Sequence, residues 1–62
     1  MFMELTTEAV NQKWVINIKS IAFFYPYNNG TRIYFIGDDE PLDVKEDHET
    51  VKRMITKTRF KL

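Results

Sequence analysis

The chain contains no cysteine, and histidine and serine each occur once, as His48 and Ser20. Without cysteine there is no disulfide, and a zinc site built without cysteine would need several histidines. A general base at His48 would also need a nucleophile beside it, and its neighbours Asp47 and Glu49 supply only carboxylates. These absences predict a protein that is not an enzyme and that needs no metal or other cofactor.

Long apolar runs and an excess of charge are also missing. No run approaches the roughly 18 apolar residues of a membrane span, and residues Met1 to Glu4 lack the basic and apolar regions of a signal peptide. Nine basic residues balance nine acidic ones, so the net charge gives no general attraction to nucleic acids or anionic membranes. We therefore expect a cytoplasmic protein without membrane association and without an evident small-molecule substrate.

The length predicts a single domain over residues 1–62. Hydrophobic residues make up 44% of the chain and aromatic residues 15%, more than a disordered segment carries, so the chain should fold. A domain of this size buries only about 60% of its surface, and it usually needs disulfides, a metal or oligomerisation to be stable. Because the composition argues against the first two, we expect a homo-oligomer, with an unusually well-packed core as the alternative.

Two short strands are predicted at the N-terminal end, over Phe2–Thr6 and Lys13–Asn17, with the polar connection Glu8–Gln12 between them. Alternation in the first segment places Met3 and Leu5 on one side. The second segment is rich in β-branched and aromatic residues, and its Trp14 is expected in the core.

The strongest local pattern is a β-hairpin between Ile21 and Ile36. Two aromatic runs flank Asn28, Asn29 and Gly30, and Asn-Gly is the preferred pair for a two-residue type I′ loop, which would pair Asn28 with Thr31. Pro26 cannot donate to a ladder and should lie at an outward-facing or bulged position. One face of the hairpin would carry Ala22, Phe24, Pro26, Ile33 and Phe35, and the other Phe23, Tyr25, Tyr27, Arg32, Tyr34 and Ile36.

Beyond a turn at residues 37–41, a strand is predicted over Leu42–Lys45 and a helix over His48–Lys57, with Asp47 as its N-cap. The helix has one apolar stripe, which should cover the drier hairpin face, that of Phe24. Residues 56–62 alternate in polarity and are predicted to form either a last strand or a basic tail. The fold class is therefore α+β, mainly β: a small antiparallel sheet of four to five strands with one short C-terminal helix.

Matching segments run along nearly the whole chain: Leu5 and Thr6, Val15 to Asn17, Thr31 to Ile33, and Val44 to Glu46 before the helix. In this order they resemble the small FlbD- and SwrD-like flagellar proteins, and the chain is similar to uncharacterised proteins of phages and mobile elements. A weaker similarity, in the succession of strands and a short helix, is to CsrA-type RNA-binding proteins. The resemblance to FlbD- and SwrD-like proteins implies the fold, and the similarity to CsrA-type proteins implies RNA binding.

The tyrosine-rich face of the hairpin is the leading candidate site, because the single helix leaves it uncovered within one copy. It is predicted to bind a partner through residue types that are enriched at interface hot spots: Tyr25, Tyr27, Arg32 and Tyr34. Tyrosine and arginine also stack on unpaired bases, so RNA is an alternative partner. A self-interface ranks first, then a foreign protein, then RNA.

Charge clustering gives two further candidate surfaces. Seven of the nine acidic residues lie between Asp38 and Glu49, and five of the nine basic residues lie between Lys52 and Lys61. An acidic surface is predicted at Asp38, Asp39, Glu40 and Asp43, and a wider version that adds Glu46, Asp47 and Glu49 would mimic DNA or bind a basic partner. A basic stripe is predicted at Lys57, Arg59 and Lys61. His48 is expected to be a solvated residue of the first helical turn.

These observations favour a small, non-enzymatic, regulatory binding protein that acts through protein–protein interaction and associates with itself. Two other functions stay open: a CsrA-like RNA-binding regulator, and an acidic inhibitor, encoded by a mobile element, of an enzyme that acts on nucleic acid.

Overall fold

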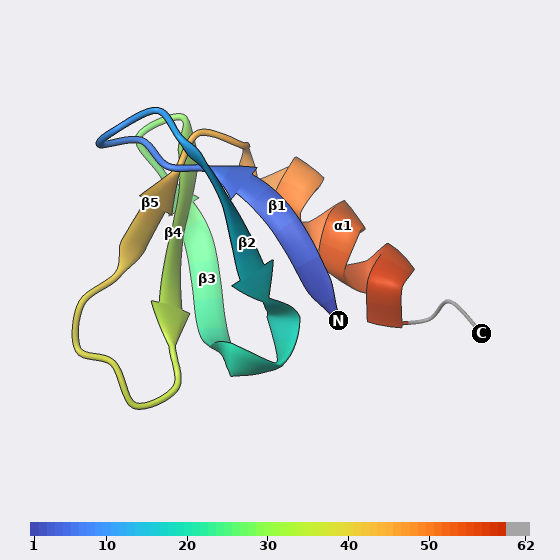
Figure 1. Cartoon of the computed structure of the whole chain (residues 1–62). Helices are drawn as coiled ribbons and strands as arrows, with labels where there is room; N and C mark the ends of the chain where they lie inside the picture. Colours follow the sequence, from blue (N-terminus) through green and yellow to red (C-terminus); the bar gives the residue numbers. More distant parts are fainter. Residues whose placement is uncertain (60–62) are drawn as a thin grey trace.

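The computed structural model describes residues 1–59, and the fold is mainly β with one helix, as the sequence predicts (Figure 1). Its elements in chain order are β1 (Phe2–Thr6), β2 (Lys13–Asn17), the 3-10 helix η1 (Ile18–Ser20), β3 (Ile21–Tyr27), β4 (Gly30–Phe35), β5 (Leu42–Val44) and α1 (His48–Arg59).

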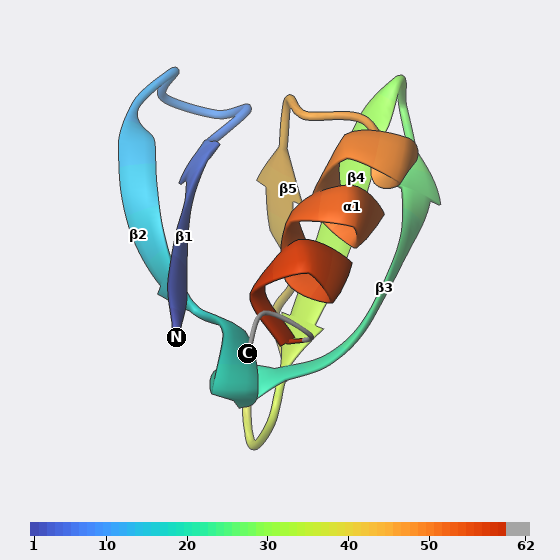
Figure 2. The same ribbon diagram turned by 90° about the vertical axis from the view of Figure 1, so that its right-hand side faces the viewer.

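The five strands form two antiparallel sheets, where the sequence predicted one. β1 pairs with β2, while β3, β4 and β5 form the second sheet in that order. The backbones of the two sheets are joined at a bridge between Thr7 and Val44, where the Lys45 amide donates to the Thr6 carbonyl at 2.8 Å. Away from this bridge they diverge, so that the hairpin β1–β2 stands apart from β3–β4–β5 with α1 in front of the larger sheet (Figure 2).

The turn between β3 and β4 lies one residue earlier than predicted. Asn28 and Asn29 form the loop, with φ of 53° and 68°, and Tyr27 pairs with Gly30. A type I′ loop needs positive φ at both central residues, and asparagine tolerates it. Gly30 is needed for another reason: a Cβ atom at this position would overlap the carbonyl oxygen of Val44. The glycine thus lets β4 approach the end of β5.

The predicted division of the hairpin into two faces survives this correction. Moving the loop by one residue shifts every pairing partner by two positions, and side chains in a strand alternate with period two. Phe24 therefore pairs with Ile33 on the inner face, and Tyr25 with Arg32 on the outer face. Ala22 is the exception: a register irregularity between Ile21 and Phe23 leaves Ala22 exposed and turns Ile21 toward the core.

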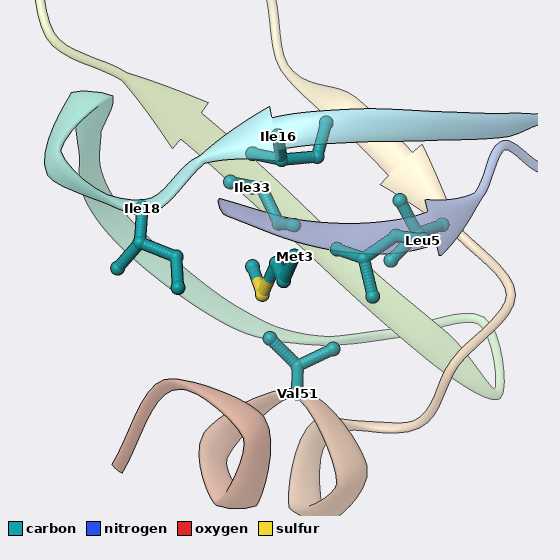
Figure 3. Packing of buried hydrophobic residues seen from close by; sticks show 7 residues of the cluster. Met3, Leu5, Ile16, Ile18, Ile33 and Val51 are labelled. Atoms are coloured by element: carbon teal, nitrogen blue, oxygen red, sulfur yellow. The ribbon is translucent and has the colours of Figure 1, made fainter. Parts of the chain in front are cut away.

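The core lies between the two sheets and α1. Val51 of α1 points toward Met3 of β1 and Ile33 of β4 (Figure 3). The buried apolar side chains come from nearly every element: Met3, Leu5, Ile16, Ile18, Ile33, Val44 and Val51. The helix thus covers the face predicted for it, where Phe24, Phe35, Met54 and Ile55 pack around the buried cluster.

Trp14 is not part of this core, contrary to the prediction. Its side chain is 45% exposed. Trp14 lies in β2, opposite Leu5 of β1. Because β2 has only β1 as a neighbouring strand, one side of the ring stays open.

The helix α1 begins after a capping residue at Asp47 and runs to Arg59. The Asp47 carboxylate accepts a hydrogen bond from the Thr50 amide at 2.8 Å, which confirms it as the N-cap. α1 continues to Arg59, so a strand over residues 56–59 is wrong, and the rest of the predicted segment lies outside the described residues. Within residues 1–59, α1 is too short and too polar to span a bilayer.

Candidate functional site

The outer face of β3 and β4 brings together the four residues predicted to bind a partner. Tyr25 and Tyr27 are 38% and 40% exposed, Arg32 and Tyr34 are half-buried, and Phe23 beside them is 54% exposed. We call these five residues the aromatic face. They alternate with inner-face residues that pack under α1, so two adjacent strands hold them on the side of the sheet away from the helix.

The rings of the aromatic face contact one another across the two strands. Phe23 stacks on Tyr34 with ring centroids 4.7 Å apart, and Tyr25 lies 6.1 Å from Tyr34 and 6.4 Å from Phe23. Offset and tilted aromatic pairs at these separations are attractive beyond the area that they bury. The rings therefore form one pre-ordered surface rather than independent mobile side chains.

Arg32 is engaged on both of its sides. Its guanidinium carbon lies 3.6 Å from the centroid of the Tyr27 ring. Its Nε and a terminal nitrogen donate to the two carboxylate oxygens of Asp43 in β5, at 2.7 and 2.9 Å. This bidentate pair neutralises the charge of Arg32 and fixes its plane.

The ionisable groups of this face perturb one another. The Arg32 guanidinium beside Asp43 lowers the pKa of that carboxyl group below its ordinary 3.8. The pKa of the Tyr34 phenol is raised above its ordinary 10.0, mainly by hydrogen bonding with Tyr25 and further by desolvation. At neutral pH the face therefore presents the uncharged phenol of Tyr34 near the ion pair of Arg32 and Asp43.

The predicted acidic surface is divided by the structure. Asp38, Asp39 and Glu40 are exposed in the loop before β5, whereas Asp43 turns to Arg32 and belongs to the edge of the aromatic face. In the described chain, no group of three or more His, Cys, Asp or Glu side chains is arranged to hold a metal ion.

In the wider acidic surface, two of the three added residues also have structural roles. Glu46 accepts hydrogen bonds from the amide and the hydroxyl of Thr6, each at 2.9 Å. Asp47 caps α1 by accepting a hydrogen bond from the Thr50 amide. Hydrogen bonding with Thr50 lowers the pKa of the Asp47 carboxyl group. Only Glu49 of the three added residues is exposed without such a hydrogen bond among those described.

The basic stripe is not a strand edge. Lys57 and Arg59 both lie in α1, and Lys61 lies outside the described residues. The exposed side of α1 instead carries Lys52, Arg53 and Lys57.

His48 is half-buried, not fully solvated as predicted. Its ring lies 5.4 Å from the Phe24 ring, and its Nδ1 is 3.8 Å from a carboxylate oxygen of Glu49. The contact with Phe24 arises because the first turn of α1 packs on the inner face of β3.

Sequence reasoning missed two features of the site. The pairing of Arg32 with Asp43 depends on the register between β4 and β5, which the long loop between them conceals. The exposure of Trp14 depends on how the two sheets diverge. A conspicuous local signal existed only for the aromatic face, in the alternation of Phe23, Tyr25 and Tyr27.

Comparison with known proteins adds no relative: the chain matches no protein-family model, no curated protein and no solved structure.

Proposed function

We propose that this chain is a small, non-enzymatic binding protein that acts through protein–protein contacts, and that it associates with a second copy through the aromatic face. One observation carries the proposal: four exposed or half-exposed aromatic rings surround an arginine whose charge is already matched by Asp43. Tyrosine, phenylalanine and arginine are enriched in interface cores, where free charges are depleted.

The neutral character of the aromatic face favours a second copy as its partner. In a two-fold interface the same patch meets itself, so an unpaired charge would face a like charge. Here the single positive charge of the face, Arg32, is compensated within each copy by Asp43. The ordered rings also lower the entropy that is lost when two such faces meet.

The face of the sheet, not the edge of β3, is the proposed contact. The pair Tyr27–Gly30 closes the two-residue loop as a hydrogen-bonded pair, and such pairs alternate with non-bonded ones along an antiparallel ladder. At Pro26, the next position, an amide hydrogen would therefore point outward from the sheet, and proline has none. This blunts the edge of β3 against strand addition.

An RNA-binding role receives less support from the same residues. Binding to RNA requires cations that reach phosphates, and stacking arginines must present their planes. The Arg32 plane is covered by Tyr27, and its nitrogens are occupied by Asp43.

The test is the solution mass by light scattering, measured for the wild type and for the double variant Tyr25→Asp with Tyr34→Asp. We expect the wild type to be a dimer or larger and the variant to be a folded monomer, because two carboxylates are costly in an aromatic interface. The matched control is Val15→Asp, which changes an exposed apolar residue of β2 and should leave the mass unchanged. Circular dichroism checks that each variant is folded.

Three results would count against the proposal. A monomeric wild type removes self-association. An unchanged mass of the double variant moves the interface elsewhere. Binding of a labelled RNA that weakens steeply with salt and requires Arg32 favours the RNA alternative.

A further inference from the structure

A second surface lies around Trp14, where the two sheets separate. Trp14 and Ile16 of β2 face Phe35, Pro41 and Leu42 across an open hollow of about 410 Å³. A second hollow adjoins it and shares Trp14, Pro41 and Leu42, with Ala9 and Val10 on its other side. Between His48 and Lys57, no residue of α1 lines either hollow. We call the two together the Trp14 groove.

The walls of the Trp14 groove are apolar, and its rim is acidic. Asp38 and Glu40 line the first hollow and Glu8 lines the second, and all three are exposed. No lysine or arginine of the described chain lines either hollow. Asp43 also borders the second hollow, but its carboxylate is taken by Arg32.

We propose that the Trp14 groove binds a segment of a partner protein that carries lysine or arginine next to aliphatic side chains. The aliphatic groups would cover Trp14, Pro41 and Leu42, and the cations would lie against Glu8, Asp38 and Glu40 or over the indole ring. Charge complementarity selects this partner, because uncompensated carboxylates around an apolar floor repel acidic segments and nucleic acid alike. A cation near an indole face gains further attraction.

Other occupants fit the groove less well. A small molecule would be poorly enclosed, since the hollows are shallow and open to solvent. The exposed side of α1 in a second copy offers Lys52, Arg53 and Lys57 but no aliphatic side chain between them. The Trp14 groove is also separate from the aromatic face, so this inference does not depend on self-association.

Trp14 is the only tryptophan of the chain, so its fluorescence reports on the groove directly. The probes are three short, end-capped peptides, in which lysine alternates with leucine, glutamate alternates with leucine, or lysine alternates with serine. We expect the lysine–leucine peptide to shift the Trp14 emission to shorter wavelength in a saturable way. The other two should bind at least about tenfold more weakly, because the glutamate–leucine peptide lacks cations and the lysine–serine peptide lacks leucine.

The matched variants are Glu40→Lys and Asp39→Lys, which change the net charge equally at neighbouring positions. Glu40 lines the groove and Asp39 does not. Glu40→Lys should weaken the lysine–leucine peptide about tenfold, whereas Asp39→Lys should leave its affinity within about twofold of the wild type.

Four outcomes would overturn the proposal. Equal weakening by both variants leaves only a general charge effect. Equal affinity for the lysine–serine peptide excludes the apolar floor as a contact, and equal affinity for the glutamate–leucine peptide excludes the acidic rim. A Trp14 emission that changes when the protein alone is diluted means that a second copy occupies the groove.

Discussion

At the scale of single residues, the two glycines are required for different physical reasons. Gly30 has no room for a side chain, because a Cβ atom would overlap the backbone of Val44. Gly37 has open space around it but a φ of 81°, which disfavours other residues.

Gly30→Ala should therefore destabilise the fold more than Gly37→Ala. In Gly37→Ala, the positive φ costs about 1–2 kcal/mol. In Gly30→Ala, the backbone of Val44 must move away, which opens the contact between β4 and the end of β5. Urea denaturation of both variants measures the difference in the free energy of unfolding. Equal losses in the free energy of unfolding would show that β5 can shift away from β4 at little cost.

The ion pair between Arg32 and Asp43 makes the stability depend on pH. The pKa of the Asp43 carboxyl group is lower in the folded protein than its ordinary 3.8, so its stabilising effect is complete above that value. The effect is lost as the pH falls through the lower, folded pKa.

Asp43→Asn should consequently lower the urea midpoint at about pH 6, and the difference from the wild type should shrink as the pH falls below 3.8 through the folded pKa of Asp43. Asp47, whose pKa is also lowered, titrates in both proteins and so does not affect the comparison. An undiminished difference at low pH would mean that the substitution acts through packing and not through charge.

At the scale of elements, the hairpin β1–β2 is fastened to the rest of the fold at one end. The bridge between Thr7 and Val44 and the hydrogen bonds from Thr6 to Glu46 make this attachment, together with the backbone bonds beside them. Elsewhere the hairpin is held by the apolar contacts of Met3, Leu5 and Ile16.

Glu46→Ala should loosen this hairpin selectively. A hydrogen bond to a charged group contributes about 1.5–3 kcal/mol, so we expect amide exchange in β1 and β2 to quicken about tenfold or more while β3 and β4 change less. Hydrogen exchange read out by NMR measures both. Glu49→Ala, which removes an exposed carboxylate of α1, is the control. A uniform increase in all strands would show that the hairpin opens only with the whole molecule.

At the scale of the whole molecule, local patterns predicted the elements and long-range packing decided the rest. The strands over residues 2–6 and 13–17 and the cap at Asp47 depend on neighbours in sequence, and all were predicted. The two faces of the β3–β4 hairpin were also predicted, since alternation is insensitive to an even shift in pairing. The position of the loop was not, because the requirement for Gly30 comes from Val44, a residue in another strand.

The division into two sheets had no local signal at all. Between the strands of the two sheets, pairing in the described chain is limited to the bridge from Thr7, after β1, to Val44 of β5, and Trp14 in β2 stays exposed. For the same reason the aromatic face was predictable as a set of residues, whereas its ion pair with Asp43 and the Trp14 groove were not.

The long-range fastening of Thr6 by Glu46, forty positions along the chain, also has a consequence for biosynthesis. As the chain leaves the ribosome, β1 and β2 can pair at once because they are adjacent, but their apolar side chains have nothing to cover them. The cover of Met3, Leu5 and Ile16 is complete only when Ile33, Val44 and finally Val51 of α1 have been synthesised. β1 and β2 are thus synthesised before the elements that secure them.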